Sequence, residues 1–229
     1  TAMRICVPVP CFFKNVPFEE AIRTIGSLGF DAAETYNWTN LDLDSVRAAC
    51  QESGVELLSM CTTDFGLTTP ENREHYLQCL KESCAAANKV GAKFLITQGG
   101  KDTGECRMKQ HDSIISTLRA AAPILEDSGV TLMVEPLNTI VNHKDAYLWS
   151  SVEGFEIVRV VDSPNVKLIY DIYHQQIMEG NIIPSIVNNL DCIAHLHCAG
   201  HPGRHELQFG ENDYKFIFQK VDESGYKGA

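Results

Sequence analysis

Segments of two kinds alternate along the chain: short apolar runs, and longer stretches in which apolar residues recur every three to four positions. The longer stretches have the periodicity of helices that bury one face. The clearest of them cover residues 18–25, 77–87, 114–125 and 183–190. Weaker helical patterns cover residues 44–53, 151–162 and 213–224. The chain is therefore expected to form a helix after each apolar run.

The apolar runs have the length and composition of short β-strands. They cover residues 4–9, 30–34, 55–60, 92–96, 130–135, 166–171 and 193–197. Four of them directly follow a glycine, the residue that most easily takes the left-handed conformation just past a helix end. These glycines are Gly29, Gly54, Gly91 and Gly129. Strands and helices in strict alternation predict an α/β chain with a parallel sheet.

Seven strand–helix units are one short of an eightfold (β/α)8 barrel, and we expect residues 1–229 to form a single domain of that class. An open doubly wound sheet is the alternative, but no Gly-x-Gly-x-x-Gly follows the first strand. The chain stops at residues 225–229, where the eighth strand should begin. We therefore expect the native polypeptide to continue into that strand, with residues 226–229 heading into a gap between the first and seventh strands.

Three side chains able to bind a metal each end a predicted strand: Glu135, Asp171 and His197. Strand side chains alternate between faces, and alternation divides these strands into two sets. One set is mostly apolar and suits packing against helices: Val130, Leu132, Val134, Val166, Leu168, Tyr170, Ala194 and Leu196. The other set points to the barrel interior: Thr131, Met133, Glu135, Lys167, Ile169, Asp171, Ile193, His195 and His197. The three strand-end residues thus share a phase at the mouth where barrel enzymes place their chemistry.

Two carboxylates and an imidazole suit one divalent cation with hard oxygen ligands, Mn²⁺ or Mg²⁺ before Co²⁺ or Zn²⁺. The alternative is that each residue merely ends its strand at a solvated loop. For one such residue that reading would be preferred, but three residues in phase favour a site. Glu135, Asp171 and His197 are therefore the candidate metal ligands.

Other residues near these strand ends are weaker candidates. His174 lies three positions after Asp171 and can join the site if the chain turns there; otherwise it is a helix-start histidine bonded to backbone. His195 is expected to support His197 rather than to bind the ion. Glu34 ends the second strand and could orient a site group, although a salt bridge or a solvated end is the preferred interpretation.

Substrate contacts are expected from the loops. Arg204 offers a planar fork for a carboxylate, a phosphate or a sugar hydroxyl, or else forms a surface salt bridge. The long segment 138–150 after the fifth strand could be a lid or pocket wall, or equally a surface excursion or a dimer contact. Aromatic residues follow the first three strands, where they could wall the mouth or simply pack: Phe12, Phe13, Trp38 and Phe65.

Composition narrows the classes of partner. The 229 residues are 44% hydrophobic and 21% charged, which are ordinary globular values. A net charge of −11 argues against nucleic acid or an anionic membrane as the main partner and leaves a small molecule, with a homo-oligomer possible. The nine cysteines include no Cys-x-x-Cys pair, so a reducing cytoplasm is expected. No apolar run is long enough to span a membrane.

Three motifs in the second half resemble the hydroxypyruvate isomerase family, which is grouped with the ketose 3-epimerases among the xylose isomerase-like barrels. They are Glu-Pro-Leu-Asn-Thr at 135–139, Tyr-Asp-Ile-Tyr-His-Gln-Gln-Ile-Met-Glu-Gly at 170–180, and Pro-Gly-Arg-His-Glu at 202–206. The resemblance is strong from about residue 130 onward and rests on element order before it. It implies a divalent metal and the interconversion of aldoses with ketoses, or of epimers.

The resemblance also implies roles for individual residues. Glu135, Asp171 and His197 match metal-ligand positions, and Glu135 also matches a catalytic carboxylate. His174 and Arg204 match substrate-contacting positions, and His174 is a second catalytic candidate. The family's fourth ligand and second base, a glutamate on the eighth strand, would lie just past Ala229. Hydroxypyruvate isomerase has Gln where this chain has His197, an epimerase feature, and residues 198–201 also differ from the family pattern.

The implied reaction removes a proton next to a carbonyl and passes through an enediolate. Return of the proton to the neighbouring carbon gives isomerisation, whereas its return from the opposite face by a second carboxylate gives epimerisation. We therefore expect a metal-dependent isomerase of small sugars or hydroxy-keto acids, with a ketose 3-epimerase as the alternative. A metal-dependent endonuclease and a non-catalytic sugar-binding barrel are less favoured. The endonuclease would need more histidine ligands and a basic groove.

Overall fold

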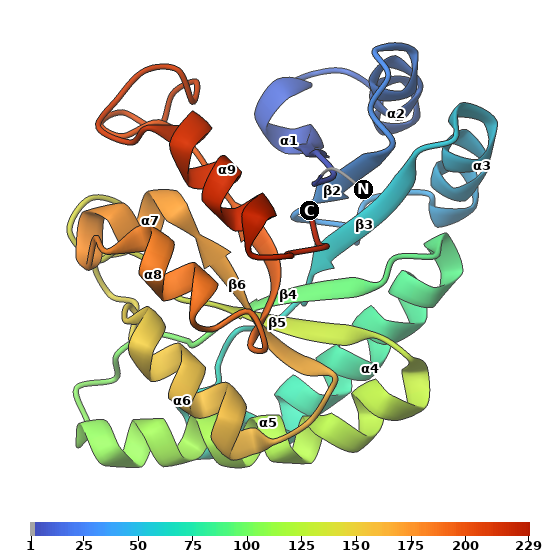
Figure 1. The fold of residues 1–229 in the computed structure, drawn as a ribbon. Coiled ribbons are helices and arrows are strands. Elements are labelled where there is room, and N and C mark those ends of the chain that lie inside the picture. Colours follow the sequence, from blue (N-terminus) through green and yellow to red (C-terminus); the bar gives the residue numbers. More distant parts are fainter. Residues whose placement is uncertain (1–2) are drawn as a thin grey trace.

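Seven parallel strands follow one another in chain order across a single curved sheet, and helices cover its outer side (Figure 1). The computed structural model describes residues 3–229. The strands are β1 (Cys6–Pro8), β2 (Ala32–Thr35), β3 (Glu56–Cys61), β4 (Phe94–Gln98), β5 (Thr131–Glu135), β6 (Val166–Asp171) and β7 (Ile193–His197). This sheet is most of a (β/α)8 barrel, so the predicted fold class is confirmed.

The helices lie largely where the periodicity predicts them. They are α1 (Val9–Phe12), α2 (Phe18–Ser27), α3 (Leu43–Ser53), α4 (Arg73–Val90), α5 (Arg107–Ser128), α6 (Ser151–Val161), α7 (Ile172–Met178), α8 (Ile182–Val187) and α9 (Tyr214–Glu223). A 3₁₀ turn, η1 (Pro70–Asn72), precedes α4. Gly54, Gly91 and Gly129 end α3, α4 and α5 in the left-handed conformation, as predicted.

Two short helices were not predicted. Helix α1 begins at Val9, a residue that the sequence pattern places in the first strand. The reason is Pro10, which cannot donate to a strand partner but fits the first turn of a helix. Helix α7 begins directly after Asp171 and precedes the predicted helix that becomes α8. Helix α7 determines how His174 is placed in the candidate site.

The core has two layers, which correspond to the two faces of the strands. The larger layer fills the space between sheet and helices and contains Val134, Leu168 and Leu196. A small inner layer consists of Ile96, Met133 and Ile169. The predicted division of faces is therefore confirmed for β5 and β6.

The division is wrong at the start of β7. Ile193 packs in the outer layer and Ala194 against the inner one, the reverse of the prediction. The cause is a shift of register, since Leu168 pairs with Ile193 whereas Ile169 pairs with His195. A bulge of this kind switches the faces of the residues before it. It leaves His195 and His197 on the interior face, as predicted.

The sheet has its two edges at β1 and β7. Across residues 3–229, β1 pairs with β2 alone and β7 with β6 alone. Residues 226–229 lie beside the free edge of β7: the Leu196 amide donates to the Ala229 carbonyl at 2.9 Å, and the Tyr226 hydroxyl to the Ala194 carbonyl at 3.4 Å. The expected gap and the direction of the last residues are thus present, and the eighth strand stays a prediction.

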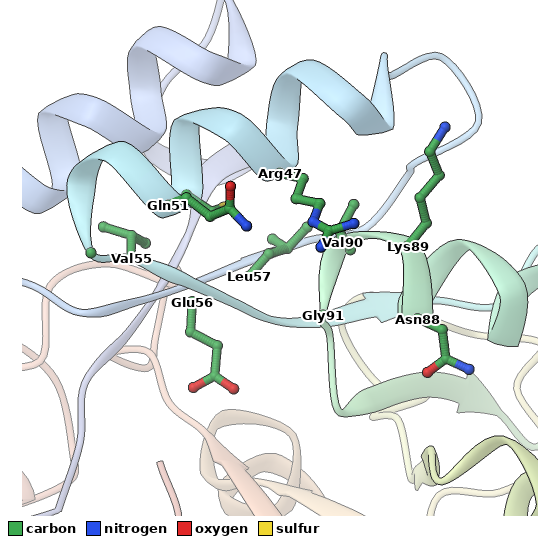
Figure 2. A pocket seen from close by; sticks show the side chains of 11 residues that line it. Arg47, Gln51, Val55, Glu56, Leu57, Asn88, Lys89, Val90 and Gly91 are labelled. Carbon is green, nitrogen blue, oxygen red and sulfur yellow. The ribbon is translucent and has the colours of Figure 1, made fainter.

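A cavity of about 390 Å³ lies at the opposite end of the sheet from Glu135 and Asp171. Figure 2 shows Val55 and Leu57 at the start of β3, with Arg47 of α3 and Lys89 of α4 beside them. The ends of α3 and α4 meet at this place, and none of the predicted site residues lines the cavity. No helix within residues 3–229 is both long and apolar enough to cross a membrane.

Candidate functional site

The carboxylates that end β5 and β6 meet inside the barrel mouth. Glu135 is 8% exposed and Asp171 is 2% exposed. Together with His174 they offer ligand atoms that all lie within 4.8 Å of one another. On the next strand, His197 pairs in register with Asp171, and its Nδ1 lies 3.4 Å from Glu135 Oε1. The structure therefore brings all four residues to one place.

The two carboxylate oxygens of Asp171 make different contacts. Oδ1 accepts hydrogen bonds from the backbone N–H groups of Tyr173 at 2.7 Å and His174 at 3.2 Å, which caps α7. Oδ2 faces inward, 3.4 Å from His174 Nε2 and 3.6 Å from Arg204 Nη2. The helix begun by this cap turns His174 toward the same interior as Asp171, as its predicted site role requires.

Hydrogen bonds from Asn138 fix the tautomer of the neutral His174 ring. The Asn138 backbone N–H donates to His174 Nδ1 at 3.2 Å, and the side-chain Nδ2 lies 2.6 Å from the same atom. Because Asn138 Oδ1 accepts from the Val141 and Asn142 amides, its Nδ2 must face His174. The Nδ1 atom is thus an acceptor, and Nε2 carries the ring proton toward Asp171. His174 is arranged as a hydrogen-bond donor rather than as a metal ligand.

The segment 138–150 forms a wall of the site. Asn142 Oδ1 accepts from the Tyr173 hydroxyl at 2.9 Å, and the His143 and His174 rings are 5.4 Å apart. At the far end of the segment, Glu179 accepts from the Ser150 hydroxyl at 2.6 Å. Both ends are therefore tied to α7 or to the turn after it, which supports the pocket-wall interpretation. A dimer contact through the same segment stays a prediction.

Arg204 lies at the rim of the site. Its backbone is left-handed, with φ of 57°, and its side chain is 44% exposed. The guanidinium carbon is 4.8 Å from the centre of the Tyr173 ring. This stacking holds the cation beside Asp171, with donors left over for a bound anion.

Two of the predicted mouth aromatics follow the packing alternative. Phe13 and Trp38 pack against the core, and Trp38 Nε1 donates to the Cys61 carbonyl at 3.0 Å. Phe12 is 71% exposed. A role of Phe12 at the mouth stays a prediction.

His197 lies between two carboxylates. Its Nε2 is 3.0 Å from Glu34 Oε1, while Nδ1 faces Glu135. Burial opposes charge on the ring, but Glu34 and Glu135 outweigh burial and raise the pKa of His197 well above its ordinary value. Burial likewise disfavours charge on Glu135, yet the hydrogen bond with His197 lowers the pKa of that carboxyl. At neutral pH Glu135 is therefore a carboxylate.

Sequence reasoning underestimated Glu34. Of the two preferred interpretations, the salt bridge is confirmed, with His197 and His195 as partners, whereas the solvated strand end is wrong because Glu34 is 2% exposed. The predicted supporting role of His195 therefore runs through this carboxylate. Burial alone would raise the pKa of Glu34, but the two imidazoles lower it well below the ordinary value. The sequence did contain one signal for a site role of Glu34: like Glu135, it closes an apolar run.

The donor set fits a divalent cation. Glu135 and Asp171 Oδ2 are hard oxygen donors whose charge is buried. Within residues 3–229, the cationic or imidazole groups that face these oxygens belong to His174, His197 and Arg204. Because His174 presents an N–H, the imidazole nitrogen available as a ligand is Nδ1 of His197. The predicted ligand set of Glu135, Asp171 and His197 is thus chemically consistent with an ion.

Known proteins resemble the chain over nearly all its length. Residues 22–229 match the sequence model described as xylose isomerase-like TIM barrel. A Danio rerio protein provisionally named hydroxypyruvate isomerase is 29% identical over 241 residues, covering 99% of this chain and 87% of that protein. The 2-oxo-tetronate isomerase of Pectobacterium atrosepticum is 27% identical over 227 residues, covering 94% and 86%.

Solved structures agree on the fold. The crystal structure titled AP endonuclease, family 2, from Brucella melitensis superposes with a TM-score of 0.92 at 25% identity, covering 99% of this chain and 90% of that one. D-psicose 3-epimerase from Clostridium cellulolyticum H10 gives a TM-score of 0.82 at 19% identity, covering 99% and 83%. At this identity the epimerase likeness is one of fold.

Proposed function

Because the chain belongs to the xylose isomerase-like TIM barrel family, we propose that it is a divalent-metal-dependent isomerase of small hydroxy-keto acids or sugars. Its relatives are named as isomerases, and it is an enzyme of that class. The observation that carries the proposal is the meeting of Glu135, Asp171 and His197 at the ends of adjacent strands. Glu135, Asp171 and His197 would hold the ion, which when bound polarises the substrate carbonyl.

Glu135 is the proton acceptor of the proposed reaction. It is a buried carboxylate with a lowered pKa, so it is ready to take a proton from the carbon next to the carbonyl. Delivery of the same proton to the neighbouring carbon converts a ketose or hydroxy-keto acid into its isomer. One base on one face of the substrate can carry this proton between the two carbons, and the hydroxyl proton must also pass to the former carbonyl oxygen to complete the 1,2-isomerisation.

His174 and Arg204 bind the substrate at two places. The Nε2–H of His174 points into the site and can donate to an oxygen that gains negative charge during the transfer. Arg204 stands farther out and suits a carboxylate at the remote end of the substrate. This arrangement favours a short hydroxy-keto acid, and the names of the two sequence relatives agree with that class.

A ketose 3-epimerase is the second candidate, favoured by the imidazole of His197. That reaction needs a second base on the opposite face of the substrate. The endonuclease alternative is disfavoured by the net charge of −11, because a protein that binds the DNA backbone must neutralise phosphates. The two isomerase candidates differ in where the proton returns, so their products differ.

A substrate panel tests the function. Short hydroxy-keto acids and three- to six-carbon ketoses and aldoses would be incubated with the protein and Mn²⁺, and the products followed by NMR. We expect isomerisation of a hydroxy-keto acid that stops when the ion is removed with a chelator. Inversion of a ketose at its third carbon would favour the epimerase, and turnover unaffected by the chelator would contradict the metal-dependent reaction.

A further inference from the structure

Glu34 is a buried carboxylate to which the proposed reaction gives no role. It is the last residue but one of β2 and is 2% exposed. Its Oε2 accepts a hydrogen bond from the Ser59 hydroxyl at 2.8 Å and lies 3.1 Å from His197 Nε2. Its Oε1 is 3.0 Å from the same nitrogen, and His195 Nε2 is 3.6 Å from Oε2. A surface ion pair would not need this many partners.

The strand register places Ser59 beside Glu34. Ala33 pairs with Leu57 but Glu34 pairs with Ser59, so β3 contains one extra residue at this point. Bulges of this kind re-aim side chains and are common beside functional sites. Here the bulge turns the Ser59 hydroxyl to the same face as Glu34, where it donates to the carboxylate. The bulge therefore supplies Glu34 with a buried hydrogen-bond donor.

The contacts of Glu34 determine which nitrogen of His197 keeps its proton when an ion displaces the other proton. A carboxylate can accept hydrogen bonds but cannot donate them. Because both oxygens lie within hydrogen-bond distance of Nε2, that nitrogen must be the N–H. Nδ1 is then the atom left to face Glu135, at 3.4 Å.

We propose that Glu34 is a positioning residue that holds His197 with Nε2 protonated, so that Nδ1 is the nitrogen presented to a divalent ion. The inference rests on the proposed function, because it needs an ion at Glu135 and Asp171. Carboxylates that accept from the distal nitrogen of a metal-binding histidine fix its ring orientation and increase its basicity. Glu34 comes from the strand farthest in sequence from His197 among the site residues, so β2 takes part in the site through His197.

Cys6, Glu34 and His195 could together be read as a second ion site, since their ligand atoms lie within 4.8 Å of one another. The hydrogen bonds favour the positioning role instead. Both Glu34 oxygens already face donors from Ser59 and His197. Burial also raises the pKa of the Cys6 thiol far above its ordinary value, so the sulfur is protonated.

The first test reads the protonation state of His197 directly. Two-bond ¹H–¹⁵N correlation spectra would be recorded on the protein loaded with Mg²⁺, which is diamagnetic. We expect His197 to carry its proton on Nε2 while Nδ1 is unprotonated. A proton on Nδ1, with Nε2 facing the ion, would overturn the inference and would leave the proposed function standing.

The second test uses Glu34→Gln, whose amide can donate to Nε2 as well as accept from it. Mn²⁺ affinity by calorimetry should fall roughly ten- to hundred-fold, with both ring tautomers visible in the Mg²⁺ form. Glu52→Gln is the matched control, because it removes the same charge from an exposed carboxylate paired with Arg23. Ser59→Ala, which removes one donor to Glu34, should cause a smaller loss.

The outcomes separate the two proposals. Equal Mn²⁺ affinity and an unchanged His197 tautomer in Glu34→Gln would overturn the positioning role alone. Wild-type protein that binds no Mn²⁺ would overturn the proposed function, and the inference with it. If Glu34→Gln fails to fold, the wild-type spectrum and Ser59→Ala still decide.

Discussion

Asn138 holds His174 through a single ring nitrogen: its backbone N–H lies 3.2 Å from Nδ1 and its side-chain amide nitrogen 2.6 Å. Asn138 follows Glu135 by three residues and is fully buried. The segment after β5 thus sets the protonation of a histidine that β6 and α7 bring into the site. The consequence is that Nε2 of His174 carries the ring proton on the side of Asp171, where the proposed reaction needs a donor.

Replacing Asn138 with Asp should damage turnover more than binding. The carboxylate would face the Nδ1 lone pair and favour a proton on that atom, so the Nε2–H donor would be lost from the neutral ring. We expect kcat to fall by roughly ten- to hundred-fold. Asn88→Asp, at an exposed helix position, is the control. An unchanged kcat in a folded Asn138→Asp protein would mean that the tautomer of His174 does not matter.

Glu135→Gln should leave the fold intact and remove turnover. The amide is similar in size and can still reach an ion, but it cannot accept the proton. A loss of about two or more decades in kcat is expected. Thermal unfolding would confirm the fold, and near-normal turnover would assign the base to another residue.

Ion binding should strengthen as pH rises. Despite burial, Glu34 and Glu135 raise the pKa of His197 well above the ordinary value, so the ring is protonated on both nitrogens at neutral pH in the ion-free protein. An ion at Nδ1 must displace that proton. Mn²⁺ affinity should therefore increase about tenfold per pH unit below the raised pKa and level off above it. Calorimetry in buffers of different ionisation enthalpy should detect close to one released proton, whereas an affinity independent of pH would contradict His197 as a ligand.

Arg204→Ala should weaken the binding of an anionic substrate. Loss of a charge-assisted pair costs about 2 kcal/mol, which is roughly a 30-fold rise in KM. Arg23→Ala removes an exposed arginine that pairs with Glu52 and should leave KM unchanged. An unaltered KM for Arg204→Ala across carboxylate substrates would return Arg204 to a surface role.

The sequence was sufficient to predict the barrel and the ends of β5, β6 and β7. Alternation along β5 and β6 gave the correct faces, because these strands are regular up to Glu135 and Asp171. The same reasoning failed at Ile193 and Ala194, where the bulge against β6 changes the register. Bulges depend on how neighbouring strands pair, and a single strand's pattern does not contain that information.

The supporting residues were harder to predict than the ligands. Glu34 and Asn138 act through hydrogen bonds to residues more than 30 positions away in the chain, which no local pattern reveals. Helix α7 was also missed, although its effect on His174 was foreseen as a turn after Asp171. Its seven residues are too few for a clear helical period.

Anomalous diffraction from crystals of the protein grown with Mn²⁺ tests the central claim most directly. The account predicts one strong manganese peak per chain, bonded to Glu135, Asp171 Oδ2 and His197 Nδ1, with His174 Nε2 close by but not coordinated. A peak at Cys6, Glu34 and His195, or no peak between Glu135 and Asp171, would contradict it.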